Sequence, residues 1–299
     1  MELVVFGAGS LGSLVGALLA RDHDVTLVGR EPHVSAIRDA GLRVRGTAEF
    51  VARPMATTDG TGLSADIAVV TVKSFDTAEA ASALATGDVG AVLSLQNGMG
   101  NEDVLADTLS VPVLAGTTTY GAVSDAPGEV EWRGGGDVVL GPWTDDAAAV
   151  ATDARDAFER ANVPTTLAGD VRRRLWEKLT INAAINPVTA LADAPNRALT
   201  DGPASELAAA VARECGSVAR ADGIDLDNST ASNAIERVAD ETASNRSSMR
   251  RDLSAGRRTE IDAITGYVVE RAAVHDESVP VNRTLLSLVR AWERERGHR

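Results

Sequence analysis

Short apolar runs alternate with amphipathic stretches in the first half of the chain, and this pattern predicts strands that alternate with helices. The expected strands are 3–6, 25–28, 42–45, 50–53, 67–72, 91–95, 113–120, 129–132, 137–141 and 164–167. The alternation at 42–45 and 50–53 favours a hairpin or paired strands. The runs at 129–132 and 137–141 are expected to pair antiparallel across three glycines.

No strand signal appears after about residue 168. The expected helices are 13–20, 145–161, 169–193, 203–222, 229–243, 257–275 and 281–296. The predicted fold is therefore an α/β Rossmann-type doubly wound sheet in an N-terminal domain, 1–167, followed by an all-α C-terminal domain, 168–299. A chain of 299 residues is long enough to form two domains with sizeable cores.

A polar stripe stands out in the first helix of the second half. Lys178, Asn182 and Asn186 are spaced four residues apart, so they lie along one face of a helix. Pro187 disfavours helix at the residue before it, and we expect the helix to end near Asn186. No charged residue occurs between Lys178 and Asp193, which indicates a buried helix whose polar side chains need partners. Those partners are either neighbouring helices, in a structural hydrogen-bond network, or a ligand.

The lysine of this stripe is one of two in the chain, and the other is Lys73. Arginine does not release its proton near neutral pH, whereas a desolvated lysine does. The presence of a lysine at position 178 therefore favours a site that needs a proton donor. The alternative is that this lysine was retained by chance.

A glycine-rich turn directly follows the first strand and opens the first helix. Its residues are Gly7, Ala8, Gly9, Ser10, Leu11 and Gly12. In this context the first glycine permits the turn, the second lets a pyrophosphate approach the backbone, and the third lets helix and strand pack closely. The helix N-terminus then faces the anion, so the sequence predicts a dinucleotide site.

Two basic residues favour NADP(H) as the cofactor. Arg30 follows the second strand, where an NAD-specific fold has an acidic residue, and an arginine there pairs with the 2′-phosphate of NADP. Lys73 follows the strand 67–72, whose carboxyl end is expected at the cofactor crevice. The alternatives are that Glu31 serves NAD, or that Arg30 is an exposed loop residue.

Two further polar residues occur where ligand contacts are expected. Asn97 follows the strand 91–95 in a loop with two glycines, which fits a ligand-facing loop or a plain turn. Glu260 is expected to open the helix 257–275 on an apolar face, so its carboxylate needs a partner, and Lys178 is the natural one. Alternatively, Glu260 is a first-turn acid that the helix dipole favours.

The formal net charge of −14 argues against nucleic acid or an anionic membrane as a partner, because both require clustered positive charge. Abundant acids with almost no lysine indicate a halophilic-type protein adapted to a salt-filled cytoplasm. The one cysteine, Cys215, is expected in a helix core and suits a cytoplasmic location. No signal peptide, membrane span or metal site is predicted.

Together, these motifs resemble the ketopantoate reductase family (2-dehydropantoate 2-reductases). The resemblance covers nearly the whole chain, and the segments around Lys178 and Glu260 are its most specific part. The segments that carry it, in the family's order and spacing, are 7–12, 71–73, 96–100, 175–179 with Asn182 and 186–187, 247–249 with Asp252, and 258–262.

The resemblance implies NADPH-dependent reduction of 2-dehydropantoate to (R)-pantoate, a step towards pantothenate and coenzyme A. It also implies a Rossmann domain, a helical domain like the C-terminal domain of 6-phosphogluconate dehydrogenase, and an active site in the cleft between them. Lys178 matches the family's general acid and Glu260 its essential carboxylate. The implied substrate contacts are Asn97, Asn182, Asn186 and Ser248, with Asn245 and Asp252 as weaker candidates. The implied cofactor contacts are Gly7 to Gly12, Arg30 and Lys73 at the 2′-phosphate, and Asn97.

The chemistry agrees with a lysine acid. Negative charge develops on a ketone oxygen when hydride arrives, and a positioned ammonium both stabilises that charge and delivers a proton. None of the four histidines (His23, His33, His275 and His298) is well placed for this role.

Two other functions stay open at this stage. One is an NAD(P)-dependent reductase of another branched 2-oxo acid, and the other is an NADP-sensing regulator without turnover. The arginines at 172–174, 250–251 and 257–258 form either a positive funnel for anions or an ordinary helix surface. The helical domain offers surfaces for a homodimer.

Overall fold

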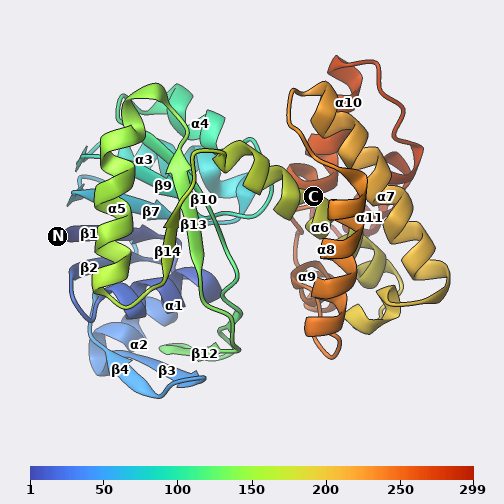
Figure 1. Ribbon diagram of the computed structural model, residues 1–299. Helices are drawn as coiled ribbons and strands as arrows, with labels where there is room; N and C mark the ends of the chain where they lie inside the picture. The colour runs from blue at the N-terminus through green and yellow to red at the C-terminus, as the bar shows by residue number, and fades with distance from the viewer. The chain divides into compact units, whose positions relative to one another are not determined.

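The computed structural model describes the backbone of residues 1–299, and the side chains of all of them except 228–230. The chain divides into two compact units (Figure 1), which are Met1–Gln96 with Asn101–Val171, and Asn97–Gly100 with Arg172–Arg299. Among the described residues, every helix is too short or too polar to cross a membrane.

An eight-stranded sheet forms the centre of the first unit, in the order β14-β13-β10-β9-β7-β1-β2-β5. Its strands are β1 (Glu2–Phe6), β2 (Asp24–Val28), β5 (Met55–Thr57), β7 (Ile67–Val70), β9 (Val92–Ser94), β10 (Val113–Thr118), β13 (Val138–Pro142) and β14 (Thr165–Leu167). All pairs from β5 to β10 are parallel, whereas β13 runs antiparallel to β10. Because β1 is central and the chain winds outward on both sides of it, the sheet is doubly wound, as predicted.

Helices cover both faces of this sheet, which explains why its strands read as continuous apolar runs. The helices are α1 (Ser10–Leu19), α2 (His33–Ala40), α3 (Thr77–Leu84), α4 (Asn101–Thr108) and α5 (Ala148–Arg160), with 3₁₀ turns η1 (Ser74–Asp76) and η2 (Asp145–Ala147). Apolar side chains of α1, α2 and α5 share one core with the sheet, with Val5, Leu14, Leu27 and Phe158 almost fully buried. Helix α3 packs beside α4.

A separate four-stranded sheet has the order β11-β12-β3-β4. Its strands are β3 (Leu42–Gly46), β4 (Phe50–Ala52), β11 (Ala122–Val123) and β12 (Glu129–Trp132), and a two-stranded sheet joins β6 (Ser64–Ala65) to β8 (Asp88–Val89). The antiparallel pairing of β3 with β4 confirms the predicted hairpin.

The predicted pairing of 129–132 with 137–141 is wrong. Strand β12 pairs with β11 and β3, while β13 pairs with β10 and β14 in the large sheet. The glycines between them, Gly134 to Gly136, have φ angles of +98°, +70° and +153°, and they lead the chain from one sheet to the other. At Gly135 an added Cβ would lie 2.2 Å from the carbonyl oxygen of Thr119, so this crossover requires glycine.

His33 fastens α2 to α1 and to the loop before β12. The backbone N–H of Gly128 donates to Nδ1 of His33 at 3.0 Å, and Nε2 lies 2.9 Å from Oγ of Ser13. Because Nδ1 accepts, the proton of the neutral ring is on Nε2 and is donated to Ser13. Burial lowers the pKa of His33 below its usual value. His33 is therefore a structural residue, in line with its exclusion from catalysis.

The His33 contacts predict a loss of stability in mild acid. Because its pKa is lower in the folded protein than the usual 6.5, the unfolded chain binds more protons in this range. The His33 contribution should be complete above the usual value and should decline as the pH falls below it toward the folded pKa. Urea unfolding of the wild type and of His33→Asn, across the pH range of histidine titration, measures this. The variant should show a smaller loss of unfolding free energy on acidification, and an unchanged loss would contradict the assignment.

The second unit is helical over its described residues, as predicted. Its elements are α6 (Val171–Leu191), η3 (Asn196–Leu199), α7 (Gly202–Ala221), α8 (Asn228–Glu241), α9 (Ser248–Ser254), the π-helical turn η4 (Asp262–Gly266), α10 (Tyr267–Val274) and α11 (Pro280–Glu295). The single helix predicted at 257–275 is wrong in its first part, since helical structure begins at Asp262 and Glu260 lies in the turn before it.

Helix α6 continues through Pro187 to Leu191, so the predicted helix range 169–193 is confirmed, whereas the helix end that Pro187 indicated near Asn186 is wrong. The hydroxyl of Thr189 donates to the carbonyl oxygen of Ile185 at 2.7 Å and approaches that of Asn186 at 3.3 Å. These bonds support the turn that holds the proline, and burial of the surrounding side chains outweighs the local preference of proline.

Candidate active site

The polar stripe lies on α6, as predicted. The helix is continuous from Lys178 to Asn186, so the stripe residues share one face. Lys178 and Asn182 are half-buried and Asn186 is buried. The residues between them are largely buried, which confirms the prediction of a buried helix.

Two neighbouring helices contact α6, one near each end of the polar stripe. The ring of Trp176 meets the edge of Tyr267 on α10, with ring centroids 5.8 Å apart. At the other end, the hydroxyls of Thr189 and Ser247 lie 2.8 Å apart, which joins α6 to the start of α9. Between them, the buried hydroxyl of Thr180 donates to the carbonyl oxygen of Trp176 within α6 itself, at 2.8 Å. The stripe is thus presented by a helix that is braced near both ends of the stripe.

Cys215 belongs to the core, as predicted. Its side chain is fully buried, and this burial raises the pKa of the thiol to about 12. The thiol therefore stays protonated at neutral pH and does not act as a nucleophile.

The segment 245–252 contains three of the predicted substrate contacts, Ser248 and the weaker candidates Asn245 and Asp252. Ser248 is the first residue of α9, next to Ser247, whose hydroxyl accepts the backbone N–H of Arg250 as the N-cap. Asp252 accepts hydrogen bonds from Arg257 at 3.0 and 3.1 Å, so its carboxylate serves the local fold. Asn245 is exposed, and its carbonyl accepts the backbone N–H of Asn196 at 3.1 Å.

Glu260 is buried and its backbone is firmly anchored. Its carbonyl oxygen accepts the N–H of Ile264 at 3.1 Å. The preceding residue, Thr259, donates its N–H and its hydroxyl to Oε1 of Glu293 on α11, at 2.7 and 2.6 Å. Glu293 is fully buried, and its other carboxylate oxygen accepts from Nε of Arg299 at 3.1 Å. The pairing of Glu260 with Lys178 stays a prediction.

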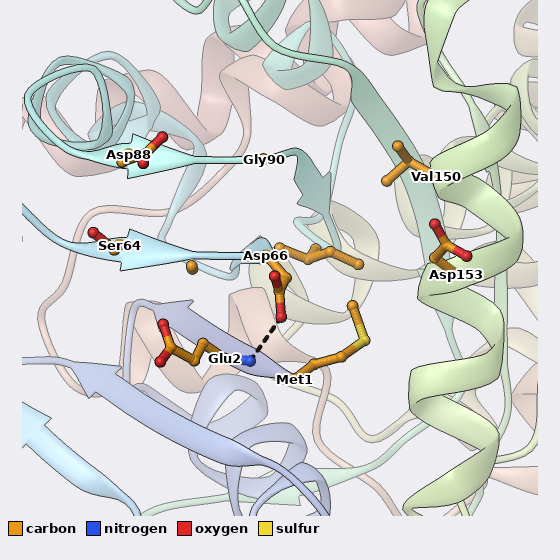
Figure 2. Close-up of a pocket in the computed structure, with 10 residues that line it drawn as sticks. Met1, Glu2, Ser64, Asp66, Asp88, Gly90, Val150 and Asp153 are labelled. Atoms are coloured by element: carbon orange, nitrogen blue, oxygen red, sulfur yellow. Dashed lines mark hydrogen bonds between the residues drawn. The ribbon is translucent and has the colours of Figure 1, made fainter.

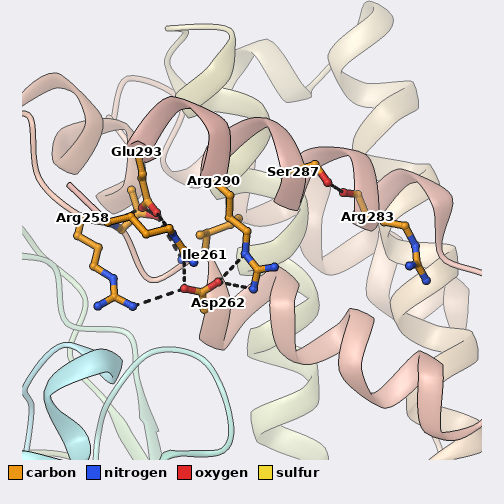
Figure 3. Close-up of polar contacts among 9 residues, drawn as sticks. Arg258, Ile261, Asp262, Arg283, Ser287, Arg290 and Glu293 are labelled. Carbon is orange, nitrogen blue, oxygen red and sulfur yellow. Dashed lines mark hydrogen bonds and ion pairs between the residues drawn. The ribbon is translucent and has the colours of Figure 1, made fainter. Parts of the chain in front are cut away.

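An arginine cluster around Asp262 completes this anchor (Figure 3). Arg290 on α11 donates to Oδ1 of Asp262 at 2.8 and 2.6 Å, and Arg258 lies 3.6 Å from Oδ2. Arg299 also pairs with this carboxylate. Although burial opposes ionisation, the hydrogen bonds from Arg290 and Arg299 lower the pKa of Asp262 below its usual value. The turn that carries Glu260 is therefore clamped on both sides, by Glu293 and Asp262, and the sequence pattern indicated a structural role for neither carboxylate.

The loop that carries Asn97 is bonded to the same segment. The backbone N–H of Met99 donates to the carbonyl oxygen of Ala263 in η4 at 2.9 Å. Gly98 has a φ of +83°, and an added Cβ there would lie 2.5 Å from that same oxygen. The close approach requires glycine. It holds the backbone of Asn97 next to the π-helical turn that follows Glu260.

The arginines near these segments pair with acids of their own unit. Arg173 and Arg174 lie 3.3 and 3.5 Å from the carboxylate of Glu177, and Arg250 lies 2.8 Å from that of Asp193. These pairs support the interpretation that the arginines are ordinary helix-surface residues, rather than the one in which they form a positive funnel for anions.

The glycine turn of the first unit fits a dinucleotide pyrophosphate. Gly7 has a φ of +113°, and an added Cβ at Gly12 would lie 2.1 Å from the carbonyl oxygen of Gly7. At Gly9, by contrast, an added Cβ would meet no atom within 4 Å. Gly9 is also the N-cap of α1, so no side chain at that position covers the first helical N–H groups. Gly7 and Gly12 are thus required by close packing, whereas Gly9 leaves space for a ligand to approach the backbone, as predicted.

Arg30 and Lys73 follow β2 and β7, the two strands that flank β1. Nη2 of Arg30 donates to Oδ2 of Asp76 at 2.9 Å. Glu31, the residue that kept NAD open, accepts the N–H and the hydroxyl of Ser35 at 3.1 and 2.6 Å. These hydrogen bonds lower the pKa of Glu31 and engage its carboxylate at the start of α2.

A buried polar cluster, which the sequence pattern did not indicate, fixes the chain beside Lys73. Nε2 of Gln96 donates to Oγ1 of Thr77 at 2.7 Å and to the carbonyl of Val72 at 3.2 Å. The Thr77 hydroxyl donates to Oδ1 of Asn101 at 2.9 Å. The feature of the sequence that could have indicated this cluster is the glutamine Gln96, which directly follows the predicted buried strand 91–95.

Two pockets lie away from all of these candidates. One of about 440 Å³ lies at the amino ends of β1 and β7 (Figure 2), opposite to the glycine turn. Four acids line it, namely Glu2, Asp66, Asp88 and Asp153, so it does not suit an anionic cofactor. The other, of about 630 Å³, lies between α10 and α11 and contains no predicted site residue.

Comparison with known proteins finds one family over nearly the whole chain. The model described as "Ketopantoate reductase PanE/ApbA" matches residues 3–145, and "Ketopantoate reductase PanE/ApbA C terminal" matches residues 170–293. A 2-dehydropantoate 2-reductase from Halobacterium salinarum is 46% identical, over 99% of this chain and 100% of its own. The corresponding protein of Pyrococcus horikoshii is 36% identical over 98% of each chain.

Solved structures give the same result. The crystal structure of a PanE/ApbA family ketopantoate reductase from Ralstonia eutropha JMP134 is 35% identical, with a TM-score of 0.91 over 100% of both chains. D-mandelate dehydrogenase, solved with NADH and anilino(oxo)acetate, is 24% identical over 100% of both chains, with a TM-score of 0.94. This second likeness concerns the fold.

Proposed function

Because the chain belongs to the ketopantoate reductase family and reduces 2-dehydropantoate to (R)-pantoate, we propose that its hydride donor is NADPH and its general acid Lys178. The observation that carries this proposal is the braced polar stripe of α6, in which the half-buried Lys178 stands in line with Asn182 and Asn186. The reaction is a step towards pantothenate and coenzyme A.

Lys178 suits the proton transfer for two reasons. Bound NADPH supplies the hydride, and negative charge then develops on the ketone oxygen of the substrate. An ammonium directed at that oxygen stabilises the charge and transfers its proton as the alcohol forms. Arg does not substitute, because the guanidinium does not release a proton near neutral pH.

Asn182, Asn186, Asn97 and Ser248 suit the remaining polar groups of the substrate. A carboxamide donates and accepts hydrogen bonds, so it matches the hydroxyl of 2-dehydropantoate in either role. Ser248, at the first turn of α9, suits the substrate carboxylate. Asn245 is a weaker candidate for a substrate contact than these four residues, because it is exposed.

Glu260 acts as the essential carboxylate of the site. A buried carboxylate needs a compensating partner, and the ammonium of Lys178 or a substrate hydroxyl meets that need. The clamp through Glu293 and Asp262 supports this role, because it fixes the backbone on either side of Glu260.

NADPH rather than NADH is supported by the basic residues after β2 and β7. Arg30 has an exposed side chain that suits a bidentate pair with the 2′-phosphate, and Lys73 suits the same group as a point charge. The carboxylate of Glu31 is engaged by Ser35, which disfavours its use for ribose hydroxyls. Gly7 to Gly12, with Asn97, complete the proposed cofactor site.

Arg30→Ala is expected to weaken NADPH binding roughly tenfold and to leave NADH binding nearly unchanged, because one exposed charged hydrogen-bond pair to the 2′-phosphate is lost. Dissociation constants from the fluorescence of the reduced nicotinamide measure both cofactors without turnover. Equal losses for NADPH and NADH would mean that the 2′-phosphate is held elsewhere.

We also propose that the enzyme works in a cytoplasm and forms a homodimer through its helical unit. The single, buried cysteine suits a reducing compartment. Size-exclusion chromatography with light scattering tests the dimer.

A further inference from the structure

We propose that Asp76 is a specificity-determining residue of the cofactor site, because its carboxylate competes with the 2′-phosphate of NADPH for Arg30. The inference rests on the proposed function, since it takes Arg30 as the 2′-phosphate ligand. Its consequence is that Asp76 restrains the preference for NADPH over NADH and keeps NADH usable.

Asp76 is bonded to both basic residues of the proposed 2′-phosphate site. Its carboxylate accepts from Nη2 of Arg30 at 2.9 Å, and its backbone N–H donates to the carbonyl oxygen of Lys73 at 2.8 Å. The second bond belongs to the 3₁₀ turn η1, which ends at Asp76. A rigid turn therefore holds this carboxylate beside the segment that carries Lys73, while Arg30 reaches it from the end of β2.

The carboxylate is oriented toward Arg30 in place of its ordinary local role. Asp76 is the N-cap of α3, a position where aspartate usually accepts a backbone N–H of the helix. Asp76 makes no such side-chain capping bond. Its carboxylate pairs with an arginine 46 positions earlier in the sequence, which indicates a role linked to Arg30 more than to the helix.

The pair is weak enough for a phosphate to break. The Arg30 side chain is 85% exposed, so water and salt screen its pair with Asp76, whose side chain is 23% exposed, and a screened ion pair contributes little net stability. A 2′-phosphate carries more charge than one carboxylate and forms a bidentate pair with a guanidinium. Arg30 therefore transfers to the phosphate when NADPH binds, and Asp76 is left as a negative charge close to another.

NADH does not meet this opposition. Its ribose carries a neutral 2′-hydroxyl, and this hydroxyl is able to donate a hydrogen bond to a carboxylate. The same aspartate thus opposes the phosphorylated cofactor and accommodates the unphosphorylated one. Asp76 follows β7, whereas Arg30 and Glu31 follow β2, so only the fold brings Asp76 to Arg30.

The test measures cofactor binding without turnover. Isothermal titration gives dissociation constants of NADPH, NADH, adenosine 2′,5′-bisphosphate and 5′-AMP for the wild type and Asp76→Asn. Glu79→Gln is the matched control, since it removes one exposed carboxylate from the first turn of the same helix. All proteins are compared at the same KCl concentration. This is the lowest concentration at which every one of them retains the circular dichroism of the wild type, because salt screens the interaction between the charges.

Asp76→Asn should tighten NADPH and adenosine 2′,5′-bisphosphate by roughly three- to tenfold, as expected for removal of one charge close to a phosphate. NADH and 5′-AMP should not tighten, and Glu79→Gln should change none of the four constants by a comparable factor. In the double variant Arg30→Ala/Asp76→Asn, the gain for NADPH should be largely lost.

Unchanged or weaker NADPH binding in Asp76→Asn would overturn the inference and make Asp76 a support for Arg30. If Asp76→Asn tightens the binding of NADH by the same factor as that of NADPH, the effect comes from the change in net charge alone. This result would overturn the inference as well. If Arg30→Ala weakens NADPH selectively while Asp76→Asn has no effect, the inference fails and the cofactor proposal stands. If Arg30→Ala affects both cofactors equally, both fail.

Discussion

Lys178→Ala is expected to lower kcat by about 10²- to 10⁴-fold, the range that a general acid supplies. The effect should fall on kcat, because the proton is needed only as charge develops on the ketone oxygen. NADPH affinity should change little, since the proposed 2′-phosphate ligands are Arg30 and Lys73. Steady-state kinetics with 2-dehydropantoate, together with fluorescence titration of NADPH, measure the two quantities separately.

Lys178→Arg separates the charge of Lys178 from its proton. The guanidinium keeps the positive charge but does not release a proton near neutral pH, so this variant should recover substrate binding more than turnover. Near-normal turnover in Lys178→Ala would remove this residue from the chemistry.

Glu260→Gln is expected to lower kcat/KM by roughly 10- to 100-fold, the equivalent of one charged hydrogen bond, without unfolding the protein. Glutamine preserves the shape of the buried side chain, and the clamp on Thr259 and Asp262 does not depend on the Glu260 carboxylate. Thermal unfolding should therefore change much less than activity.

The matched control for this variant is Glu270→Gln, which removes an exposed carboxylate from α10. It should leave both activity and thermal stability near the wild type. If Glu260→Gln unfolds under conditions where Glu270→Gln is intact, Glu260 serves the fold, as a buried structural acid would.

Features set by local spacing could be predicted from the sequence. The four-residue spacing of Lys178, Asn182 and Asn186 gives one helix face whatever packs around it, and α6 has that face. The turn Gly7 to Gly12 likewise carries its own steric reasons, which the close approach of Gly12 to Gly7 bears out. Both motifs were placed correctly because the backbone geometry alone decides them.

Features decided by packing of distant segments were predicted wrongly. Pro187 indicated a helix end, but burial and the Thr189 hydroxyl carry α6 past it. Gly134 to Gly136 indicated a hairpin turn, but the strands on either side find better partners in different sheets. In each case a local preference of about 1–3 kcal/mol competed with tertiary contacts that the sequence does not reveal.

Pairs between oppositely charged residues were the hardest to foresee. The chain has 43 acidic residues, so neither Asp76 as the partner of Arg30 nor Glu293 as the anchor of Thr259 was identifiable by type. Only the fold selects them, Asp76 by the 3₁₀ turn after β7 and Glu293 by the buried face of α11. Asp76 contacts the predicted ligand Arg30, and Glu293 anchors the residue before the predicted carboxylate Glu260. The sequence therefore indicated the candidates but not the groups that position or oppose them.

The most direct test of the account follows the absorbance of the reduced nicotinamide after 2-dehydropantoate is added to the enzyme, in molar KCl, with NADPH and with NADH in separate experiments. The account predicts rapid oxidation of NADPH and slower, but measurable, oxidation of NADH. Oxidation of NADH alone would contradict the assignment of Arg30. No oxidation of either cofactor, by a folded protein that binds NADPH, would contradict the account as a whole.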